Sequence, residues 1–385
     1  MKKKRVLIIN HEFPPIGGGA ATASDRIAKG LSSSGAEVLV MTSSFKNLKG
    51  KSDWHDITLW RIPSWRRSKA TGSFFEAILF TLSALFYSLI AAVRFKPDVI
   101  ISFFGVPAGI IALWLKKVFR KPYIISMRGI DVPGSQSNEP LIRYIHLLIK
   151  PLLMAIWKNA SALVANSESL KKLALDSAPS MAIKVINNGV DVKTYQPPRD
   201  KIRKSPISIL FVGRLRIEKG IQTFIEAINI LRQKKCASFK VDIVGDGKMR
   251  NSLQRYAEAC GMTDVVLFHG WKASDVLPEM YCRSDIFVIP SFYEGMSNAL
   301  FEAMASGLPI IASDIPSNSE FVKDQDNGLL FPAGDSNKLA SSLQRLIEDE
   351  SLCKHMGINS RHIAEYFGWH KTVQHYAETI DEIIS

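Results

Sequence analysis

Cysteine is scarce in this chain of 385 residues, and its four cysteines, Cys236, Cys260, Cys282 and Cys353, contain no C-x-x-C pair. The sequence therefore indicates neither a disulfide framework nor a zinc site, and it is typical of a reducing compartment. The apolar run after the basic first residues, Val6 to Ile9, is too short for a signal peptide but has the length of a buried strand. A hydrophobic share of 46% excludes a disordered chain and a collagen-like fibre.

Acidic residues are in the minority, with 36 Asp and Glu against 49 Lys and Arg, a net charge of +13. Residues 1–190 carry 26 basic and 11 acidic residues, a net of +15, whereas residues 191–385 carry 23 and 25, a net of −2. The first half therefore holds the whole excess, which indicates an anionic partner: a membrane, a phosphorylated ligand or a nucleic acid. A solvated basic face that only aids solubility is the alternative.

Short apolar runs alternate with helix-length amphipathic segments in both halves of the chain. Buried strands are expected at residues 6–9, 38–40, 99–101, 123–125, 162–164, 184–186, 209–212, 241–244, 265–267, 286–289 and 309–311. Such strands predict α/β architecture with parallel sheets covered on both faces. Two sets, each opening with a strand and a glycine turn, predict two Rossmann-like domains facing across a cleft, at 1–190 and 208–367, with a Pro-rich basic linker at 191–207.

Residues 74–93 form a long apolar stretch whose one charge is Glu76. A membrane span there would separate residues 6–9 and 99–102, which should share a sheet, so a helix packed on that sheet is favoured. Tryptophans stand among basic residues just upstream, and a second apolar stretch follows: Trp54, Trp60, Trp65, Arg61, Arg66, Arg67, Lys69 and residues 141–157. This composition is typical of an interfacial anchor, although two core helices beside a basic loop remain the alternative.

Two turns after expected strands are suited to phosphate. In the first, Phe13–Gly19, glycines let the backbone approach a phosphate or sugar at a helix N-terminus, but the G-x-G-x-x-G spacing of a nicotinamide site is missing. In the second, Arg214 and Lys219 flank a turn that leads into a helix. Two cations there suit a diphosphate, and surface charge beside a loop is the other interpretation.

A third segment, Ser291–Pro309, contains two acids eight residues apart, Glu294 and Glu302. We expect them at the start of a helix and about two turns in, so that both carboxylates point into one cleft. Carboxylates accept hydrogen bonds from pairs of sugar hydroxyls, and Gly295 frees backbone N–H groups at Met296–Asn298 for an anion. An exposed helix face is disfavoured by the apolar residues around Glu302.

Taken together these motifs resemble glycosyltransferase family 4, retaining enzymes of the GT-B fold. The resemblance covers nearly the whole chain and rests on the glycine turn at 17–19, Val185–Asp191, Gly213-Arg214, Lys219-Gly220, Val244–Gly247, His269-Gly270 and the E-x7-E segment. Many members carry a histidine before the Gly-x-Asp that follows the fourth strand, whereas this chain has Arg128 there, with Asp131 as the aspartate. Arg128 could bind a phosphate of donor or acceptor, and Asp131 could position the acceptor hydroxyl.

The resemblance also implies a donor site and a closing helix. Its implied contacts are Arg214 and Lys219 with the donor diphosphate, Glu302 with the ribose, Glu294, Gly295, Met296, Ser297 and Asn298 with the donor sugar, and Gly18 and Gly19 closing from the other domain. Residues 368–385 would form the family's C-terminal helix, which crosses back onto the first domain. Asp324 and Asp326 have the D-x-D spacing of metal-using transferases, but a polar turn is favoured there.

The expected function is that of a retaining, metal-independent glycosyltransferase with no cofactor beyond its nucleotide-sugar co-substrate. It would move a sugar from a UDP- or GDP-sugar to a lipid-linked or cell-surface glycan. The protein would be cytoplasmic and held peripherally at the inner face of the membrane. A nucleotide-sugar 2-epimerase, which needs no second substrate, is the first alternative. A nucleic-acid-binding protein is the second, but it rests on charge alone because no recognition motif appears.

Overall fold

The structure, a computed structural model, describes residues 3–68, 73–129, 131–134, 140–198, 203, 205–234 and 238–385, and only the backbone of 140–146. Lys69, Cys236 and part of the expected linker lie outside these residues. The chain forms two compact units, Met1–Gly189 with Trp369–Ser385, and Val190–Gly368. It therefore passes into the second unit once and returns to the first with its final helix.

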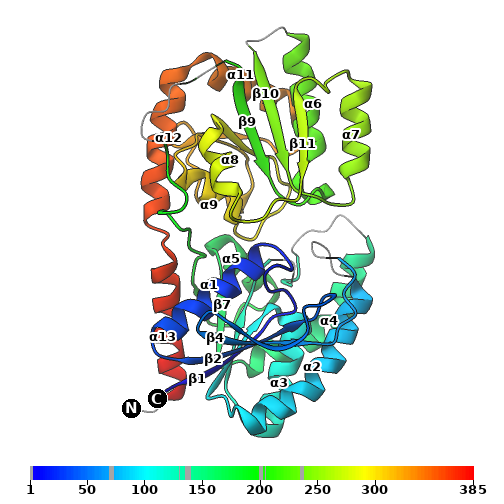
Figure 1. The fold of residues 1–385 in the computed structure, drawn as a ribbon, viewed down its shortest axis with the longest axis vertical. Coiled ribbons are helices and arrows are strands. Elements are labelled where there is room, and N and C mark those ends of the chain that lie inside the picture. Colours follow the sequence, from blue (N-terminus) through cyan, green and yellow to red (C-terminus); the bar gives the residue numbers. More distant parts are fainter. Residues whose placement is uncertain are drawn as a thin grey trace. The chain divides into compact units, whose positions relative to one another are not determined.

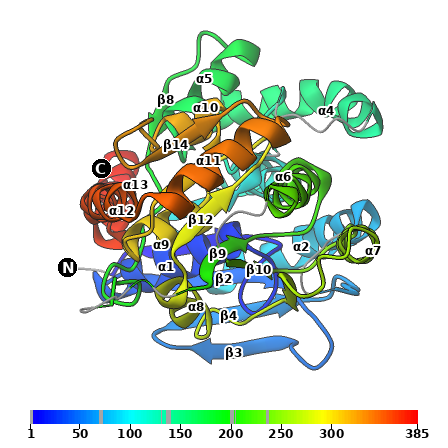
Figure 2. The same ribbon diagram turned by 90° about the horizontal axis from the view of Figure 1, so that it is seen from above.

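The first unit is built on an eight-stranded sheet of order β3-β4-β2-β1-β5-β6-β7-β8, in which only the edge strand β3 runs antiparallel to its neighbour. Its strands are β1 (Arg5–Ile9), β2 (Glu37–Ser43), β3 (Gly50–Trp54), β4 (Ile57–Ile62), β5 (Val99–Phe103), β6 (Tyr123–Ser126), β7 (Ala162–Ala165) and β8 (Ile183–Val185). Figure 2 shows β3 at the outer edge of this sheet, beside β4.

Helices cover both faces of the first sheet. They are α1 (Gly19–Ser33), α2 (Phe74–Arg94), α3 (Gly109–Phe119), α4 (Pro140–Asn159), α5 (Glu168–Ser177) and α13 (Trp369–Ile384), with a short π-helical turn η1 (Phe104–Ala108). Leu7 and Ile9 of β1 pack with α2 to α5, whereas Val6 and Ile8 pack with α1 and α13. In Figure 1, α2, α3 and α4 lie together on one side of the sheet, and α13 lies beside α1.

The second unit has a six-stranded parallel sheet of order β11-β10-β9-β12-β13-β14. Its elements are β9 (Ile207–Val212), η2 (Ile217–Lys219), α6 (Ile221–Gln233), β10 (Phe239–Val244), α7 (Arg250–Ala259), β11 (Val266–Gly270), α8 (Leu277–Arg283), β12 (Ile286–Ile289), α9 (Asn298–Ala305), β13 (Ile310–Ser313), α10 (Pro316–Ser319), β14 (Gly328–Phe331), α11 (Ser336–Glu348) and α12 (Glu350–Glu365). Ile209 and Phe211 of β9 pack with α6, α7 and α11, and Leu210 packs with α8 and α9.

The segment expected as a linker, 191–207, is part of the second unit. Tyr195 is buried there, and the guanidinium of Arg361 donates to the carbonyl oxygens of Val192 and Tyr195 at 3.1 and 2.8 Å. This contact fixes residues 192–195 to α12, so they do not form a free connection.

The long apolar helix at 74–93 is α2, and it is long and apolar enough to cross a membrane. However, it connects β4 to β5, which lie in one sheet, and it buries Phe80, Ala84, Ala91 and Ala92 against that sheet. A helix that joins two strands of the same sheet must pack on it, as expected from the sequence.

Candidate active site

The sheet of the second unit has a topological switch point between β9 and β12. β9 comes first in the chain, and the next strand, β10, lies on one side of it while β12 lies on the other. In open α/β sheets, ligands bind beyond the carboxyl ends of the strands at such a point. The two loops that leave these ends, 213–220 after β9 and 290–297 after β12, contain most of the predicted donor-site residues.

Glycines hold these loops close together. A Cβ on Gly220, which has φ +62°, would lie 1.9 Å from the carbonyl oxygen of Pro290, and the N–H of Phe292 donates to the carbonyl of Glu218 at 2.9 Å. A Cβ on Gly245, after β10, would lie 1.8 Å from the carbonyl oxygen of Gly213. Only glycine permits such approaches, so the backbone itself sets the shape of the site.

Lys219 and Glu294 form an ion pair across the two loops. The Nζ of Lys219 lies 2.5 Å from Oε1 of Glu294, and the hydroxyl of Ser291 donates to the same oxygen at 2.7 Å. The side chain of Glu294 is 9% exposed and that of Lys219 is 23% exposed. Since a shielded ion pair is screened less than one on the surface, this contact orients both groups at the switch point.

Glu294 lies in the loop before α9, and not on that helix as the eight-residue spacing predicted. The reason is local: the hydroxyl of Ser297 caps α9 by accepting from the N–H of Leu300, so that the helix begins at Asn298. Met296 and Ser297 therefore lead into the helix, and Gly295 follows Glu294 in the loop.

Glu302 lies just over one turn into α9 and is held by α8. The phenol of Tyr281 donates to Oε2 of Glu302 at 2.9 Å. Burial, and next the nearby carboxylate of Glu302, raise the pKa of Tyr281 well above its ordinary value, so the phenol stays a donor. Tyr281 and Ser291 were not predicted as site residues from the sequence. Ser291 lies three residues before Glu294 in the same loop, which is a local signal, whereas Tyr281 has none.

Arg214 is half-buried in the turn that follows β9, five residues before Lys219. The next residue of this turn, Leu215, donates its N–H to the carbonyl of Asp246 at 3.0 Å. The turn is thus tied to the loop after β10. Arg214 and Lys219 consequently leave the sheet from the same rigid loop at the end of β9.

The glycine turn of the first unit follows β1, at the switch point between β1 and β5. Gly17 has φ +100°, and a Cβ there would lie 2.6 Å from the Cβ of Glu12. Gly18 is the N-cap of α1, and Gly19 is its first residue. The turn therefore delivers its backbone directly to a helix N-terminus, as the sequence predicts.

Two buried arginines from β4 and the segment after it hold this turn. Nη2 of Arg66 lies 3.4 Å from Oε1 of Glu12, and both side chains are nearly buried. Nη2 of Arg61 donates to the carbonyl of Pro14 at 2.6 Å, and burial lowers the pKa of Arg61 to about 10. The sequence predicts these arginines in an interfacial anchor or, as the alternative, in a basic loop beside core helices; in the structure both are buried and hold the turn and the two residues before it.

Arg128 and Asp131 lie together in the loop after β6. The carboxylate of Asp131 accepts from the N–H groups of Arg128 at 3.0 Å, Gly129 at 3.1 Å and Gly105 at 2.8 Å. Burial raises the pKa of Asp131 and lowers that of Arg128. The guanidinium of Arg128 donates to Oδ1 of Asn188 at 2.6 Å and lies 4.4 Å from the ring centroid of Phe103.

Asp324, in the D-x-D segment, accepts from the N–H of Leu330 at 2.8 Å and so closes a turn. Within the described ranges no group of three or more His, Cys, Asp or Glu residues is placed to hold a metal ion.

Two family models cover most of the chain. The model described as Glycosyltransferase Family 4 matches residues 17–194, and that described as Glycosyl transferases group 1 matches residues 192–363. The chain belongs to the family 4 glycosyltransferases. The matched segments contain Gly17–Gly19 of the first turn, the turn with Arg214 and Lys219, and the whole of the Ser291–Pro309 segment.

Individual relatives of this glycosyltransferase extend the comparison. A glycosyltransferase of Methanocaldococcus jannaschii is 26% identical over 383 residues, which are 95% of each chain. An Escherichia coli enzyme named UDP-Gal:alpha-D-GlcNAc-diphosphoundecaprenol alpha-1,3-galactosyltransferase is 32% identical over 194 residues, 48% of this chain and 49% of that enzyme.

Solved structures share the fold. Sucrose-phosphate synthase from Thermosynechococcus elongatus has a TM-score of 0.87 at 20% identity, with 99% of each chain covered. Anabaena HepE in complex with UDP-glucose has a TM-score of 0.77 at 20% identity, with 98% of this chain and 99% of HepE covered. The two-domain α/β fold of this glycosyltransferase is therefore the GT-B fold that the sequence predicted.

Proposed function

We propose that this glycosyltransferase uses a UDP- or GDP-sugar, whose diphosphate binds Arg214 and Lys219. The observation that carries the proposal is the ion pair between Lys219 and Glu294 at the switch point of the second sheet. It holds an ammonium beside a carboxylate, the two groups that a nucleotide-sugar needs at its phosphate and at its sugar hydroxyls. HepE, which shares the fold, was solved with UDP-glucose, and this supports the same class of donor here.

The remaining donor contacts follow from the same loops. We assign the donor sugar to Glu294 and to the segment Gly295–Asn298, which leads into the N-terminus of α9. We assign the ribose hydroxyls to Glu302, whose carboxylate Tyr281 orients by its hydrogen bond. Gly18 and Gly19, at the N-terminus of α1, contribute backbone to the diphosphate.

The reaction breaks the bond between the anomeric carbon and the diphosphate, so negative charge grows on the departing nucleotide. Arg214 and Lys219 stabilise that charge, which is the main electrostatic contribution of this chain. The acceptor hydroxyl attacks the same face, so the anomeric configuration is retained, and no metal is required. Both properties rest on the resemblance to family 4.

Asp131 and Arg128 act as positioning residues in this proposal. Both carboxylate oxygens of Asp131 accept hydrogen bonds from backbone N–H groups, and one of these bonds fixes the loop after β6 to Gly105, just after β5. Arg128 lies over Phe103 and holds Asn188. Both residues lie in the loop after β6, beside the segment that follows β5. We propose that the acceptor binds here and that these residues shape its site.

The acceptor is a lipid-linked or cell-surface glycan, and the enzyme builds a polysaccharide at the inner face of a membrane, on the cytoplasmic side. The galactosyltransferase from E. coli acts, by its name, on a diphosphoundecaprenol-linked sugar, which supports a lipid-linked acceptor. The basic first half supports an anionic surface as partner. A 2-epimerase receives no such support, because the named relatives are transferases.

The test is nucleotide release from a panel of UDP- and GDP-sugars by the purified protein, with and without extracted membrane lipid. We expect release from one donor, an increase with lipid, and loss of the activity in Glu294→Ala. A protein that releases no nucleotide, and whose melting temperature no donor raises, would refute the proposed donor. Release that needs no acceptor and yields a 2-epimeric sugar would favour the epimerase.

A further inference from the structure

α2 has an apolar stripe on its outer face. Phe74, Ile78, Leu82 and Phe86 recur at four-residue spacing, and these residues are 65%, 42%, 61% and 62% exposed. Residues four apart lie on the same side of a helix, so these side chains form one continuous line. Isolated exposed apolar side chains are ordinary, but a continuous line of them marks a contact surface.

The neighbouring helix α3 extends this surface. A cavity of about 320 Å³ lies between the two helices and is lined by Leu82, Leu85, Phe86, Leu89 and Trp114. Trp114 is 41% exposed at its mouth. The cavity is therefore an apolar recess that opens on the same face as the stripe.

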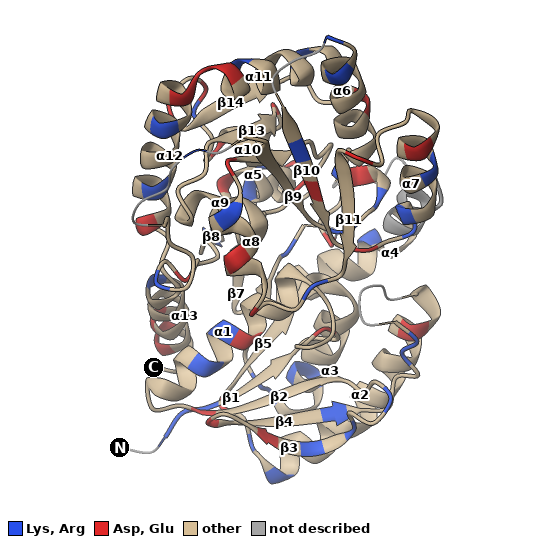
Figure 3. Cartoon of the chain, turned by 45° about the horizontal axis from the view of Figure 1, so that its top comes forward, with Lys and Arg blue, Asp and Glu red and all other residues tan. Residues whose placement is uncertain are grey.

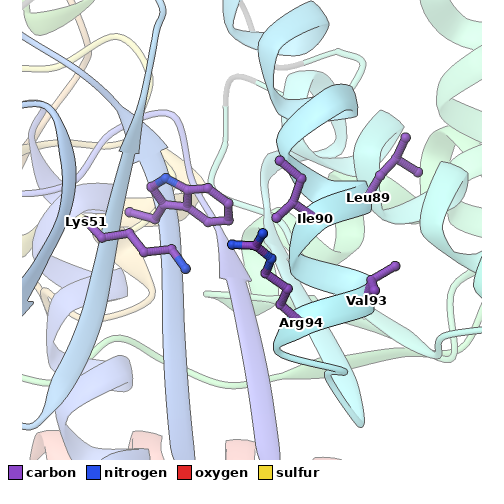
Figure 4. Close-up of a pocket in the computed structure, with 6 residues that line it drawn as sticks. Lys51, Leu89, Ile90, Val93 and Arg94 are labelled. Carbon is purple, nitrogen blue, oxygen red and sulfur yellow. The ribbon is translucent and has the colours of Figure 1, made fainter.

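A second cavity adjoins the first, because Leu89 lines both. It has a volume of about 530 Å³ and lies between the edge strands and the last turns of α2, lined by Lys51, Trp60, Leu89, Ile90, Val93 and Arg94. Figure 4 shows Lys51 reaching into it from the strand side and Arg94 from the helix side. The two cavities together form a groove with an apolar length and a cationic end.

The cations at this end have no acidic partner within the part of the chain that the structure describes. The Nζ of Lys51 lies 4.3 Å from the ring centroid of Trp60, so the indole is its main neighbour. Arg94 is exposed in the last turn of α2. Both cations lie on the basic half of the chain, whose Lys and Arg segments Figure 3 shows in blue.

The groove is separate from the glycine turn. α2 runs from the carboxyl end of β4 to the amino end of β5, so Val93 and Arg94 lie toward the amino ends of the strands. The glycine turn leaves the carboxyl end of β1, which runs parallel to β5. The cationic end of the groove therefore lies at the opposite edge of this sheet from the glycine turn.

We infer that the groove binds one anionic membrane phospholipid, with its headgroup phosphate between Lys51 and Arg94 and an acyl chain along Leu89 toward Trp114. Two unpaired cations beside an apolar recess complement an amphiphile with a negative head, and the uncharged outer face of α2 complements the acyl region. The inference deepens the membrane association of the proposed function and rests on it.

The test is flotation of the full-length protein with phosphatidylcholine vesicles, with and without phosphatidylglycerol. We expect binding to the anionic vesicles and about a tenfold weaker partition for Lys51→Glu with Arg94→Glu. The matched control, Lys172→Glu with Lys193→Glu, changes the net charge equally at exposed sites away from the groove and should keep most of the binding. Phe86→Ser, at an exposed position, should weaken binding without loss of fold.

Three results would overturn the site. An equal loss in the control pair would show diffuse charge attraction. Competition by inorganic phosphate, at matched ionic strength, would make the ligand a free anion. Self-association that Phe86→Ser abolishes, measured by light scattering, would assign the stripe to a second copy of the chain. The donor-induced rise in melting temperature should survive in the groove variants, and its absence in the wild type would refute the donor proposal independently of the vesicles.

Discussion

Lys219 and Glu294 belong to different loops, and the Nζ of Lys219 lies 2.5 Å from Oε1 of Glu294. Lys219→Ala removes the ammonium that we assign to the departing diphosphate. We expect kcat/KM to fall by about 100-fold, the loss typical of one group that stabilises developing charge. Steady-state nucleotide release measures it. Lys248→Ala, at an exposed position in the same unit, is the control and should leave the rate unchanged.

The same variant also separates binding from folding. Since Ser291 still donates to Glu294, the carboxylate keeps one partner, and we expect the circular dichroism spectrum of Lys219→Ala to match the wild type. Full activity in Lys219→Ala would remove Lys219 from the donor site.

Tyr281 is buried and donates a hydrogen bond to Glu302. Its contribution to the free energy of unfolding therefore depends on pH. Its pKa in the folded protein is well above the ordinary value of 10.0, chiefly because of burial. The folded state thus holds a proton that the unfolded state releases above pH 10, so this contribution to stability is complete below pH 10 and falls as pH rises. In Tyr281→Phe the fall in stability above pH 10 should be smaller than in the wild type, although not absent, because burial also raises the pKa of Tyr123. Urea unfolding at pH 8 and above pH 10 would measure the difference. If the free energy of unfolding depended on pH equally in the wild type and in Tyr281→Phe, the assignment of this effect to Tyr281 would be wrong.

The turn between β9 and α6 depends on Gly220. Ala at this position would meet the carbonyl oxygen of Pro290 at 1.9 Å as well as adopt φ +62°. Gly261→Ala is a matched control, because Gly261 has φ +66° in the same unit but meets only the end of the Arg232 side chain at 3.4 Å. We expect Gly261→Ala to cost about 1–2 kcal/mol of unfolding free energy and Gly220→Ala distinctly more.

Nucleotide binding gives a second measurement on these two glycine variants. Since the clash would displace the loop that carries Glu294, only Gly220→Ala should also weaken the nucleotide-induced rise in melting temperature. Equal losses of stability and equal nucleotide responses in both variants would show that the close approach to Pro290 has no role in the site.

The central strands could be predicted from the sequence because each is a short, continuous apolar run, as in β1 and β9. β3 could not, since Gly50–Trp54 is mostly polar and exposed at the sheet edge, where pairing with β4 and not burial holds it. β14, Gly328–Phe331, was also not predicted, since it begins with a glycine and contains no β-branched residue. Strand order likewise depends on pairings distant in the chain, which no local pattern records.

The donor-site residues could be named from the sequence, but their contacts could not. The spacing predicted Glu294 on a helix, because residues eight apart lie on nearly the same helical face. Ser297 caps α9, however, so the helix begins at Asn298 and Glu294 lies before it. The hydrogen bond from Tyr281 to Glu302 joins α8 to α9 across 21 positions and leaves no pattern in either segment. Arg66 is similar, because its partner Glu12 is 54 positions away.

Charge is divided unevenly between the two halves of the chain. Residues 191–385 have a net charge of −2, although we assign the polyanionic donor to them. Local cations therefore suffice there, since Arg214 and Lys219 are placed by a rigid loop. The first half carries a net of +15, which is more than a single small ligand requires and is consistent with the anionic surface that we propose as its partner.

The two units differ in how many segments of the chain form them. We therefore expect the second unit to fold without the first, but not the residues before Val190 to fold without the rest of the chain. Val190–Gly368 is one continuous segment, whereas the first unit needs α13 from the chain's end, whose Val373, Tyr376 and Ile380 are buried with the core on the α1 side. Residues 190–368 expressed alone should therefore fold, whereas residues 1–189 alone should expose that core and aggregate.

The isolated second unit should also keep the nucleotide site. Whichever of UDP or GDP raises the melting temperature of the full chain should raise that of residues 190–368, and Lys219→Ala should remove the effect in both. A smaller rise in the fragment is expected, because Gly18 and Gly19 are missing from it. A folded fragment that binds neither nucleotide would move the diphosphate site to the first unit, and Arg214 and Lys219 would then be surface charges beside a loop.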